Sequence, residues 1–320
     1  MINRGEKINR SAIYQNFTDK WLQHERWRRA LGTPDRLYFC TQLALHFYKT
    51  QENSVHWREL PDFIREYFKK RINMPEDIDI FESDARTSNF LVREEQGGQY
   101  SFVHKSFMEF FVARHFHDAI QKRIPNGLDD LKDFTRSRVI LEFLIELLDT
   151  NDIEFLRSDA FYVDKENYLE LMTQRQSTTK RIYTNPESVG NCAYLLLKKG
   201  LTLDGANLDE AKLSNISLDN VSFLKTSFIG AQFNGGTFVN VNFQGARLSY
   251  ANFEGAELKN INFAKADLEK ANFLNATIDS KTLESLAKST YWGSLKISPE
   301  YKRRIQISYE KPGPLHTIGS

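Results

Sequence analysis

One large apolar residue recurs at every fifth position between residues 203 and 278, and a small or β-branched residue stands two positions before it in all but the first unit. The other three positions of each unit are mostly polar. A period of five fits neither the 3.6-residue turn of an α-helix nor the alternation of a β-strand. It does fit a coil with four sides of five residues, each of which turns one large and one small side chain inward. The predicted core is the set of large residues: Leu203, Leu208, Leu213, Leu218, Phe223, Phe228, Phe233, Phe238, Phe243, Leu248, Phe253, Leu258, Phe263, Leu268, Phe273 and Ile278.

Such a coil places residues twenty positions apart above one another, so the phenylalanines are expected to stack in columns. Four coils at the β-spacing of about 4.8 Å give a solenoid about 19 Å tall. Burial of each central side chain contributes roughly 1.5 to 3 kcal/mol before the entropy of ordering the chain is counted. The core is therefore predicted to be continuous along a single axis.

The units ANLDE at 206–210, ANFEG at 251–255 and ADLEK at 266–270 resemble the A(D/N)LXX motif of the pentapeptide-repeat family. The resemblance covers residues 201–280. It implies a right-handed quadrilateral β-helix, a rigid rod that family members use in many settings.

The open ends of a solenoid need covering. Asn185 followed by Pro186 indicates a helix start and Gly200 its stop, which predicts a capping helix before the first coil. At the other end Lys281 breaks the pattern, and residues 280–289 are predicted to form a short closing helix. The tail at residues 311–314 is expected to fray.

Residues 8–160 are predicted to be mostly helical, with apolar faces that include Ile13, Phe17, Trp21 and Leu22. Segments 90–95 and 99–103 flank the glycines at 97–98 and predict a β-hairpin. Helices, a hairpin and a long helix in this order are typical of a winged-helix unit. The predicted organisation is a helical, winged-helix-like domain at 1–160, a linker and capping helix at 161–200, a four-coil solenoid at 201–280, and a cap helix and tail at 281–320.

Residues 100–114, YSFVHKSFMEFFVAR, resemble the F-x-H-x-S-F-x-E-F-x-x-A pattern that follows the nucleotide-binding core of NACHT-type (STAND) signalling NTPases. The resemblance implies that His104 contacts the phosphate of a bound nucleotide. A structural role at a helix start accounts for His104 equally well. The 320 residues contain no G-x-x-x-x-G-K-S/T loop, so we expect either the C-terminal part of such a protein or a degenerate relative without its own NTPase.

Composition narrows the function classes. Lys and Arg number 43 against 42 Asp and Glu, a net charge of +1 that gives no overall attraction to nucleic acid or anionic lipid. Cys40 and Cys192 lie in apolar stretches, which favours buried free thiols in a reducing compartment. We find neither a signal core nor about 18 successive apolar residues, and we expect a cytoplasmic protein without a membrane span.

No pattern in the sequence indicates a catalytic site, a metal site or a cofactor. His115 and His117 could join Glu109 as metal ligands, but positions i and i+2 face apart on a helix. Arginines and lysines at 26–29 and 69–71 could suit a DNA-binding winged helix, yet nearby acidic residues favour solvated faces. We therefore predict that the chain is not an enzyme and that nucleic acid is not its partner.

The outward positions of the solenoid remain as the candidate binding surface. Acidic and basic residues are mixed there, which disfavours the alternative of a DNA mimic that acts on DNA gyrase. Apolar residues at outward positions could mark a contact with a protein: Leu224, Ile229, Val239, Tyr250 and Leu274. The leading hypothesis is a non-enzymatic interaction or sensing module of a NACHT-like signalling or defence protein. A nucleotide-dependent switch whose NTPase lies elsewhere stays open as a second alternative, as do the partner's identity and self-association.

Overall fold

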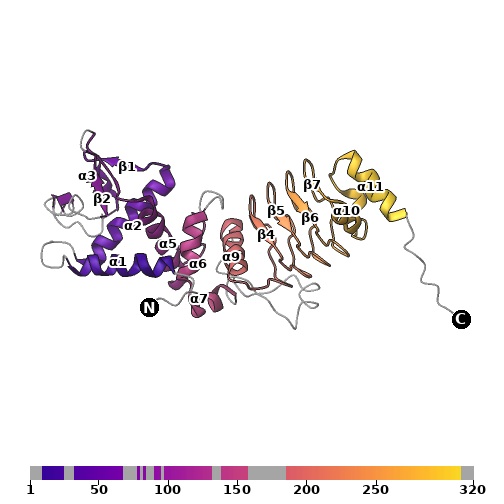
Figure 1. The fold of residues 1–320 in the computed structure, drawn as a ribbon, viewed down its shortest axis with the longest axis horizontal. Helices are drawn as coiled ribbons and strands as arrows, with labels where there is room; N and C mark the ends of the chain where they lie inside the picture. Colours follow the sequence, from indigo (N-terminus) through magenta and orange to yellow (C-terminus); the bar gives the residue numbers. More distant parts are fainter. Residues whose placement is uncertain are drawn as a thin grey trace, which may run out of the picture. The chain divides into compact units, whose positions relative to one another are not determined.

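The computed structural model describes residues 9–24, 32–67, 78–79, 82–83, 90–94, 97–131, 138–157 and 185–310 (Figure 1). The chain divides into two compact units, of which the first comprises 1–121 with 138–148, and the second 122–137 with 149–320. The basic residues at 26–29 and 69–71, and the tail at 311–314, lie outside the described residues.

The first unit contains helices around a small antiparallel sheet. Its helices are α1 (Arg10–His24), α2 (Thr33–Thr50), α3 (Leu60–Tyr67), α5 (Lys105–Gln121) and α6 (Arg138–Leu147). Its strands are β1 (Ser54–His56), β2 (Leu91–Arg93) and β3 (Gln99–Phe102), in the order β1-β3-β2.

The hairpin expected from the sequence is present, with Leu91 opposite Phe102. Gly98 has a φ of +65°, and a Cβ on this residue would lie 2.5 Å from the Trp57 ring, so the turn requires glycine. The sequence did not reveal β1, which pairs Val55 with Tyr100 and makes β3 the central strand. This strand is three residues long, too short to show a periodic pattern.

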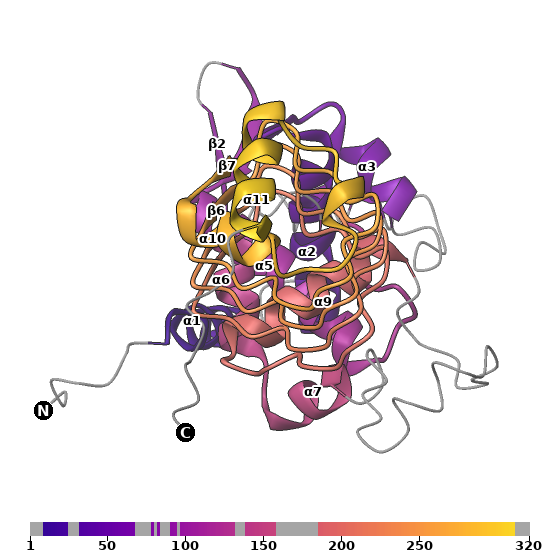
Figure 2. The ribbon, with the colours of Figure 1, turned by 90° about the vertical axis from the view of Figure 1, so that its right-hand side faces the viewer.

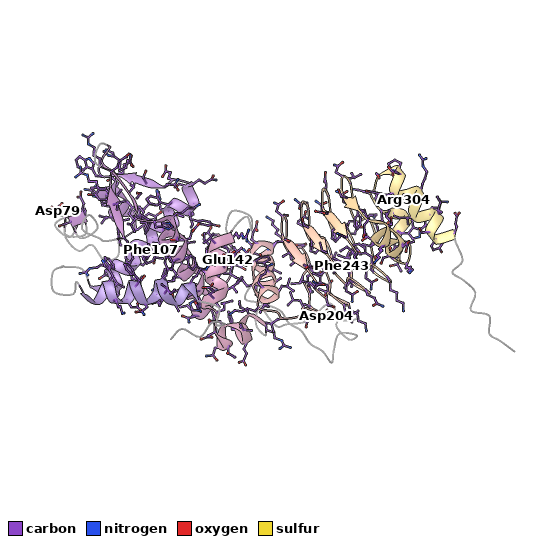
Figure 3. The ribbon with its side chains drawn as sticks, viewed as in Figure 1. Asp79, Phe107, Glu142, Asp204, Phe243 and Arg304 are labelled. Carbon is purple, nitrogen blue, oxygen red and sulfur yellow. The ribbon has the colours of Figure 1, made fainter. Side chains whose placement is uncertain are left out.

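Aromatic side chains form the core of the first unit. Phe90 is fully buried, with its ring centroid 4.3 Å from that of Trp21 and 5.0 Å from that of Phe107, which Figure 3 labels. Helix α1 departs from the expectation in one respect, because Ile13 and Phe17 are more than half exposed although they belong to the predicted apolar face.

The second unit contains the solenoid and its caps. Its helices are α7 (Thr150–Phe155), α9 (Pro186–Lys198), α10 (Ser280–Leu286) and α11 (Pro299–Glu310), with a 3₁₀ turn, η2, at Trp292–Ser294. Its named strands are β4 (Ser217–Asp219), β5 (Thr237–Val239), β6 (Glu257–Lys259) and β7 (Thr277–Ile278), which form one parallel sheet in that order.

Residues 201–280 form a four-sided β-solenoid, seen along its axis in Figure 2. Parallel pairs join residues twenty apart on every side, as between Leu218 and Phe238 or between Asn207 and Ser227. The large residues predicted to form the core are all buried. Phe243, inside the coils in Figure 3, stacks on Phe223 with centroids 5.2 Å apart and on Phe263 at 5.4 Å.

The corners of the coil explain the residue types at the last position of each unit. The last residue of each of the first fifteen units has a positive φ, between 55° and 73°. This left-handed conformation suits glycine and asparagine, which together occupy ten of these corners. Within the sides, an Asn often accepts a hydrogen bond from the backbone two residues later, as Asn252 does from Glu254 N–H at 3.1 Å.

Helix α9 covers the start of the solenoid. As the sequence suggests, the Asn185 side chain caps it by accepting from Glu187 N–H at 2.9 Å. Lys212 N–H donates to the Pro186 carbonyl at 3.1 Å, which occupies one of the edge donors of the first coil. A Cβ on Gly190 would lie 2.0 Å from the Lys212 carbonyl oxygen, so the absence of a side chain permits this approach.

A fifth coil follows the last repeat, although its sequence has lost the pattern. Thr290 pairs with Asp267, and Lys296 with Asn272, in parallel bridges that continue two of the sides. Leu295 and Ile297 are buried above the last repeat coil. Helix α10 takes the place of another side, where Ser285 Oγ accepts a hydrogen bond from Phe263 N–H.

Among the residues that the structure describes, no helix is long and apolar enough to cross a membrane.

Candidate functional site

The parallel register divides the outer surface of the solenoid into four faces. Counted from the first coil, and then every twenty residues, face A begins at 201–205, face B at 206–210, face C at 211–215 and face D at 216–220. The last residue of each stretch lies at a corner. Two outward side chains therefore stack in one column only when their positions agree modulo twenty, and they share a face when their five-residue stretches do.

The five apolar residues predicted at a partner surface are spread over all four faces. Leu224 lies on face A, Val239 on face D and Leu274 on face C, whereas Ile229 and Tyr250 both belong to face B. Only Tyr250 and Leu274 are strongly exposed, and the other three are intermediate. Thus Ile229 and Tyr250 alone share a face, near the edge between faces B and C, and the five residues do not form a single apolar patch.

The edge between faces B and C carries the column Glu210, Gly230, Tyr250 and Lys270. Tyr250 is 52% exposed, and the Lys270 ammonium lies 5.2 Å from its ring centroid and 3.1 Å from its hydroxyl. This hydrogen bond raises the pKa of the Lys270 ammonium. Gly230, the residue below Tyr250 in this column, has no side chain. The column thus presents an aromatic ring and an ammonium side by side, and this ammonium also lies 3.5 Å from the Glu269 carboxylate.

Charge is distributed unevenly, but no face is a continuous acidic strip. Faces A, B, C and D have net charges of +1, −2, 0 and −2 in residues 201–279. On face B the acidic residues of the first and last coils are separated by Ser227 and Arg247. A mimic of DNA needs a regular line of negative charge, and these faces do not supply one.

Face C carries a ladder of amides. Asn272 Nδ2 donates to Asn252 Oδ1 at 3.1 Å, and Asn252 Nδ2 donates to Gln232 Oε1 at 3.2 Å. These side chains satisfy one another, so they stiffen the face and have fewer groups left for a ligand.

His104 lies immediately before α5 and is exposed. Ser106 N–H donates to its Nδ1 at 3.2 Å, and the Ser106 hydroxyl contacts both this nitrogen and the Tyr14 hydroxyl. Because Nδ1 accepts a hydrogen bond, the neutral ring carries its proton on Nε2. The arrangement serves as a helix cap and also leaves Nε2–H as a donor.

Two carboxyl groups of the first unit have opposite environments. Burial raises the pKa of Glu109, whose carboxylate lies 3.7 Å from the Lys105 ammonium. A hydrogen bond from Arg10, at 2.7 Å, lowers the pKa of Glu142. Within the described ranges, neither carboxylate is hydrogen-bonded to a hydroxyl or a thiol, and no group of three or more His, Cys, Asp or Glu could hold a metal ion.

Two family models match the solenoid. Residues 218–261 match a model described as pentapeptide repeats (9 copies), and residues 246–279 match a second pentapeptide-repeat model (8 copies). This segment therefore consists of pentapeptide repeats, as the motif indicates.

A relative in Nostoc, an uncharacterized WD repeat-containing protein, is 30% identical over 119 residues, or 36% of this chain. The chain spans 8% of that protein's length. Solved structures with similarity include a pentapeptide repeat protein from Nostoc (20% identity, 29% of this chain and 84% of the other, TM-score 0.17). Another is HetL of Nostoc, a pentapeptide repeat protein involved in regulating heterocyst differentiation (23% identity, 29% and 54%, TM-score 0.17).

Proposed function

We propose that this chain is a non-enzymatic protein-docking module, in which the outer surface of the pentapeptide solenoid binds a protein partner. The observation that carries the proposal is the contrast between its two surfaces. Inward positions obey one rule in every coil, whereas outward positions of one column, such as Asn207, Ser227, Arg247 and Asp267, follow none. A solenoid with a fixed core can change its exterior without losing its fold.

We further propose that the docking module belongs to a NACHT-like signalling or defence protein, with residues 1–160 as a winged-helix-like domain. The pattern at residues 100–114 supports this, as does the order of helices and hairpin in the first unit.

A nucleotide-dependent switch is the second candidate. Its support is the exposed His104, whose Nε2–H is free of the cap that holds Nδ1. In this version an NTPase on another chain, or elsewhere in a longer protein, supplies the phosphate-binding loop.

The docking proposal is tested by photo-crosslinking with the full chain in its native host. A photoreactive residue replaces Leu224, Tyr250, Leu274 or Val239 in turn, which samples faces A, B, C and D. We expect a discrete protein adduct from one face or from two adjacent faces. An excess of this chain without the photoreactive residue should prevent formation of the adduct. Equal adducts from all four faces, or none from any, would reject a docking surface on the solenoid.

A further inference from the structure

Exposed aromatic residues lie along the edge between faces B and C, at its C-terminal end. Tyr250 lies on the third coil. Tyr291 and Tyr309, 63% and 65% exposed, belong to the loop of η2 and to α11. Solvation alone does not account for three exposed rings at one end of a rod, since large exposed apolar groups in a cluster mark contact surfaces.

These residues are connected through a short series of contacts. The Lys270 backbone N–H donates to Ser294 Oγ at 3.0 Å, which places the η2 loop directly above Lys270, and the Lys270 ammonium contacts Tyr250 below. The Trp292 ring lies 5.6 Å from that of Tyr309. We call the set Tyr250, Lys270, Tyr291, Trp292, Lys302 and Tyr309 the aromatic edge.

The loop holds its rings outward at a cost in backbone energy. Tyr291 takes the position at which an inward residue would continue the fifth coil, yet its φ is 58° and its side chain is exposed. Left-handed backbone is unfavourable for a tyrosine and persists only where the surrounding structure holds it, as it also does at the Tyr250 corner, where φ is 62°. The Lys302 ammonium donates to the Gly293 carbonyl at 3.1 Å, which fixes a cation beside the rings.

The charge of this end differs from that of the coils. Residues 280–310 contain six Lys and Arg and three Glu, a net charge of +3, whereas residues 201–279 contain six Lys and Arg and nine Asp and Glu, a net charge of −3. A partner with local carboxylates is therefore attracted to the cap. A long polyanion such as nucleic acid would also meet the acidic coils, which disfavours it.

We propose that the aromatic edge binds an acidic segment of the partner protein, with apolar side chains against the tyrosines and carboxylates at Lys270 and Lys302. This inference rests on the proposed docking function and names the chemistry of its partner. Tyrosine hydroxyls supply additional donors for carboxylates, and tyrosine and tryptophan are enriched at the centres of interfaces.

The test measures fluorescence anisotropy of labelled peptides with the full chain. Three coil steps span about 14 Å, which an extended chain covers in about four residues. The probe is about twice this length, roughly eight residues, and alternates glutamate with leucine. Its control replaces each glutamate with glutamine. We expect the acidic peptide to bind at least about tenfold more tightly than the neutral one.

Matched variants separate this edge from overall charge. Lys270→Glu with Lys302→Glu should weaken the acidic peptide at least about tenfold, whereas Lys259→Glu with Lys265→Glu, the same charge change on faces D and A, should leave it within about twofold. Tyr291→Ser with Tyr309→Ser should also weaken binding while the melting curve is retained, because both rings are exposed.

Three outcomes overturn the inference: no binding of the acidic peptide, equal losses in both lysine pairs, or tighter binding of single-stranded DNA than of the peptide. If the peptide fails while crosslinking from the solenoid still yields one protein, docking survives and only the acidic partner is rejected. If crosslinking fails as well, both proposals are rejected.

Discussion

Phe243 offers the sharpest test of the solenoid core. Its side chain is fully buried, stacked between Phe223 and Phe263, and its ring centroid lies 5.9 Å from those of Phe228, Phe233 and Phe253. Phe243→Ala removes the ring from the middle of this cluster. Truncation of a buried phenylalanine typically costs about 3 to 5 kcal/mol, of which each aromatic pair accounts for about 0.5 to 1.5 kcal/mol.

Phe243→Leu should cost less, about 1.5 kcal/mol or below, because leucine fills the equivalent inward position in other units, such as Leu248. The matched control is Leu274→Ala, which truncates an exposed residue of the same solenoid and should change stability by about 0.5 kcal/mol or less.

Hydrogen exchange resolved to solenoid peptides is the suitable assay, since the chain has two compact units and its global unfolding need not be two-state. At about 1.4 kcal/mol per tenfold, Phe243→Ala should speed exchange of the neighbouring coils by about two to four powers of ten. Exchange no faster than in Leu274→Ala would refute the proposed packing of the core.

Three further perturbations test the cap, the first unit and a buried hydroxyl. Gly190→Ala should loosen α9 by about 1 to 3 kcal/mol, because its Cβ would overlap the Lys212 carbonyl; exchange in α9 reports this, and Gly293→Ala, with nothing within 4 Å, is the control. Glu109→Gln should gain stability relative to the wild type as the pH rises from the ordinary carboxyl pKa through the raised pKa of Glu109. The folded wild type holds that proton more tightly than the unfolded chain, so the wild type loses stability in this pH window. Urea titrations across pH measure the difference in stability, and a difference that does not change with pH would contradict the prediction. Thr226→Val should cost about 1 kcal/mol in thermal or urea unfolding, since the Leu203 carbonyl loses the Thr226 hydroxyl and keeps only the Ala206 N–H as a donor, and an unchanged stability would contradict that role.

The sequence determines the solenoid because period and burial are linked there by simple geometry. One inward residue per side, a small companion and a left-handed corner repeat in every unit, so the prediction needs no long-range information. Helix α9 could also be predicted from the sequence, because Asn185 and Pro186 mark its start. Its contact with the first coil depends on Gly190, which sequence reasoning had no means to distinguish from an ordinary helical glycine.

The fifth coil and the aromatic edge were not predicted, for a different physical reason. Leu295 and Ile297 lie inward, but a loop at 291–294 interrupts the five-residue spacing, so the periodic signal ends before the fold does. The edge combines Lys270 with Tyr309, which lie on separate elements and meet only through tertiary structure. Conversely, the five apolar outward residues that the sequence groups as one partner surface lie on four different faces.

The equivalence of the four sides has a consequence for how such a chain can change. Insertion of twenty residues would lengthen the rod and preserve the alignment of every column. Insertion of five residues would satisfy the interior equally well but would rotate the following coils by a quarter turn. The cap and its tyrosines would then point in a different direction relative to the earlier coils. Duplication of one short unit could thus reorient a binding surface in a single event, without altering any residue that contacts the partner.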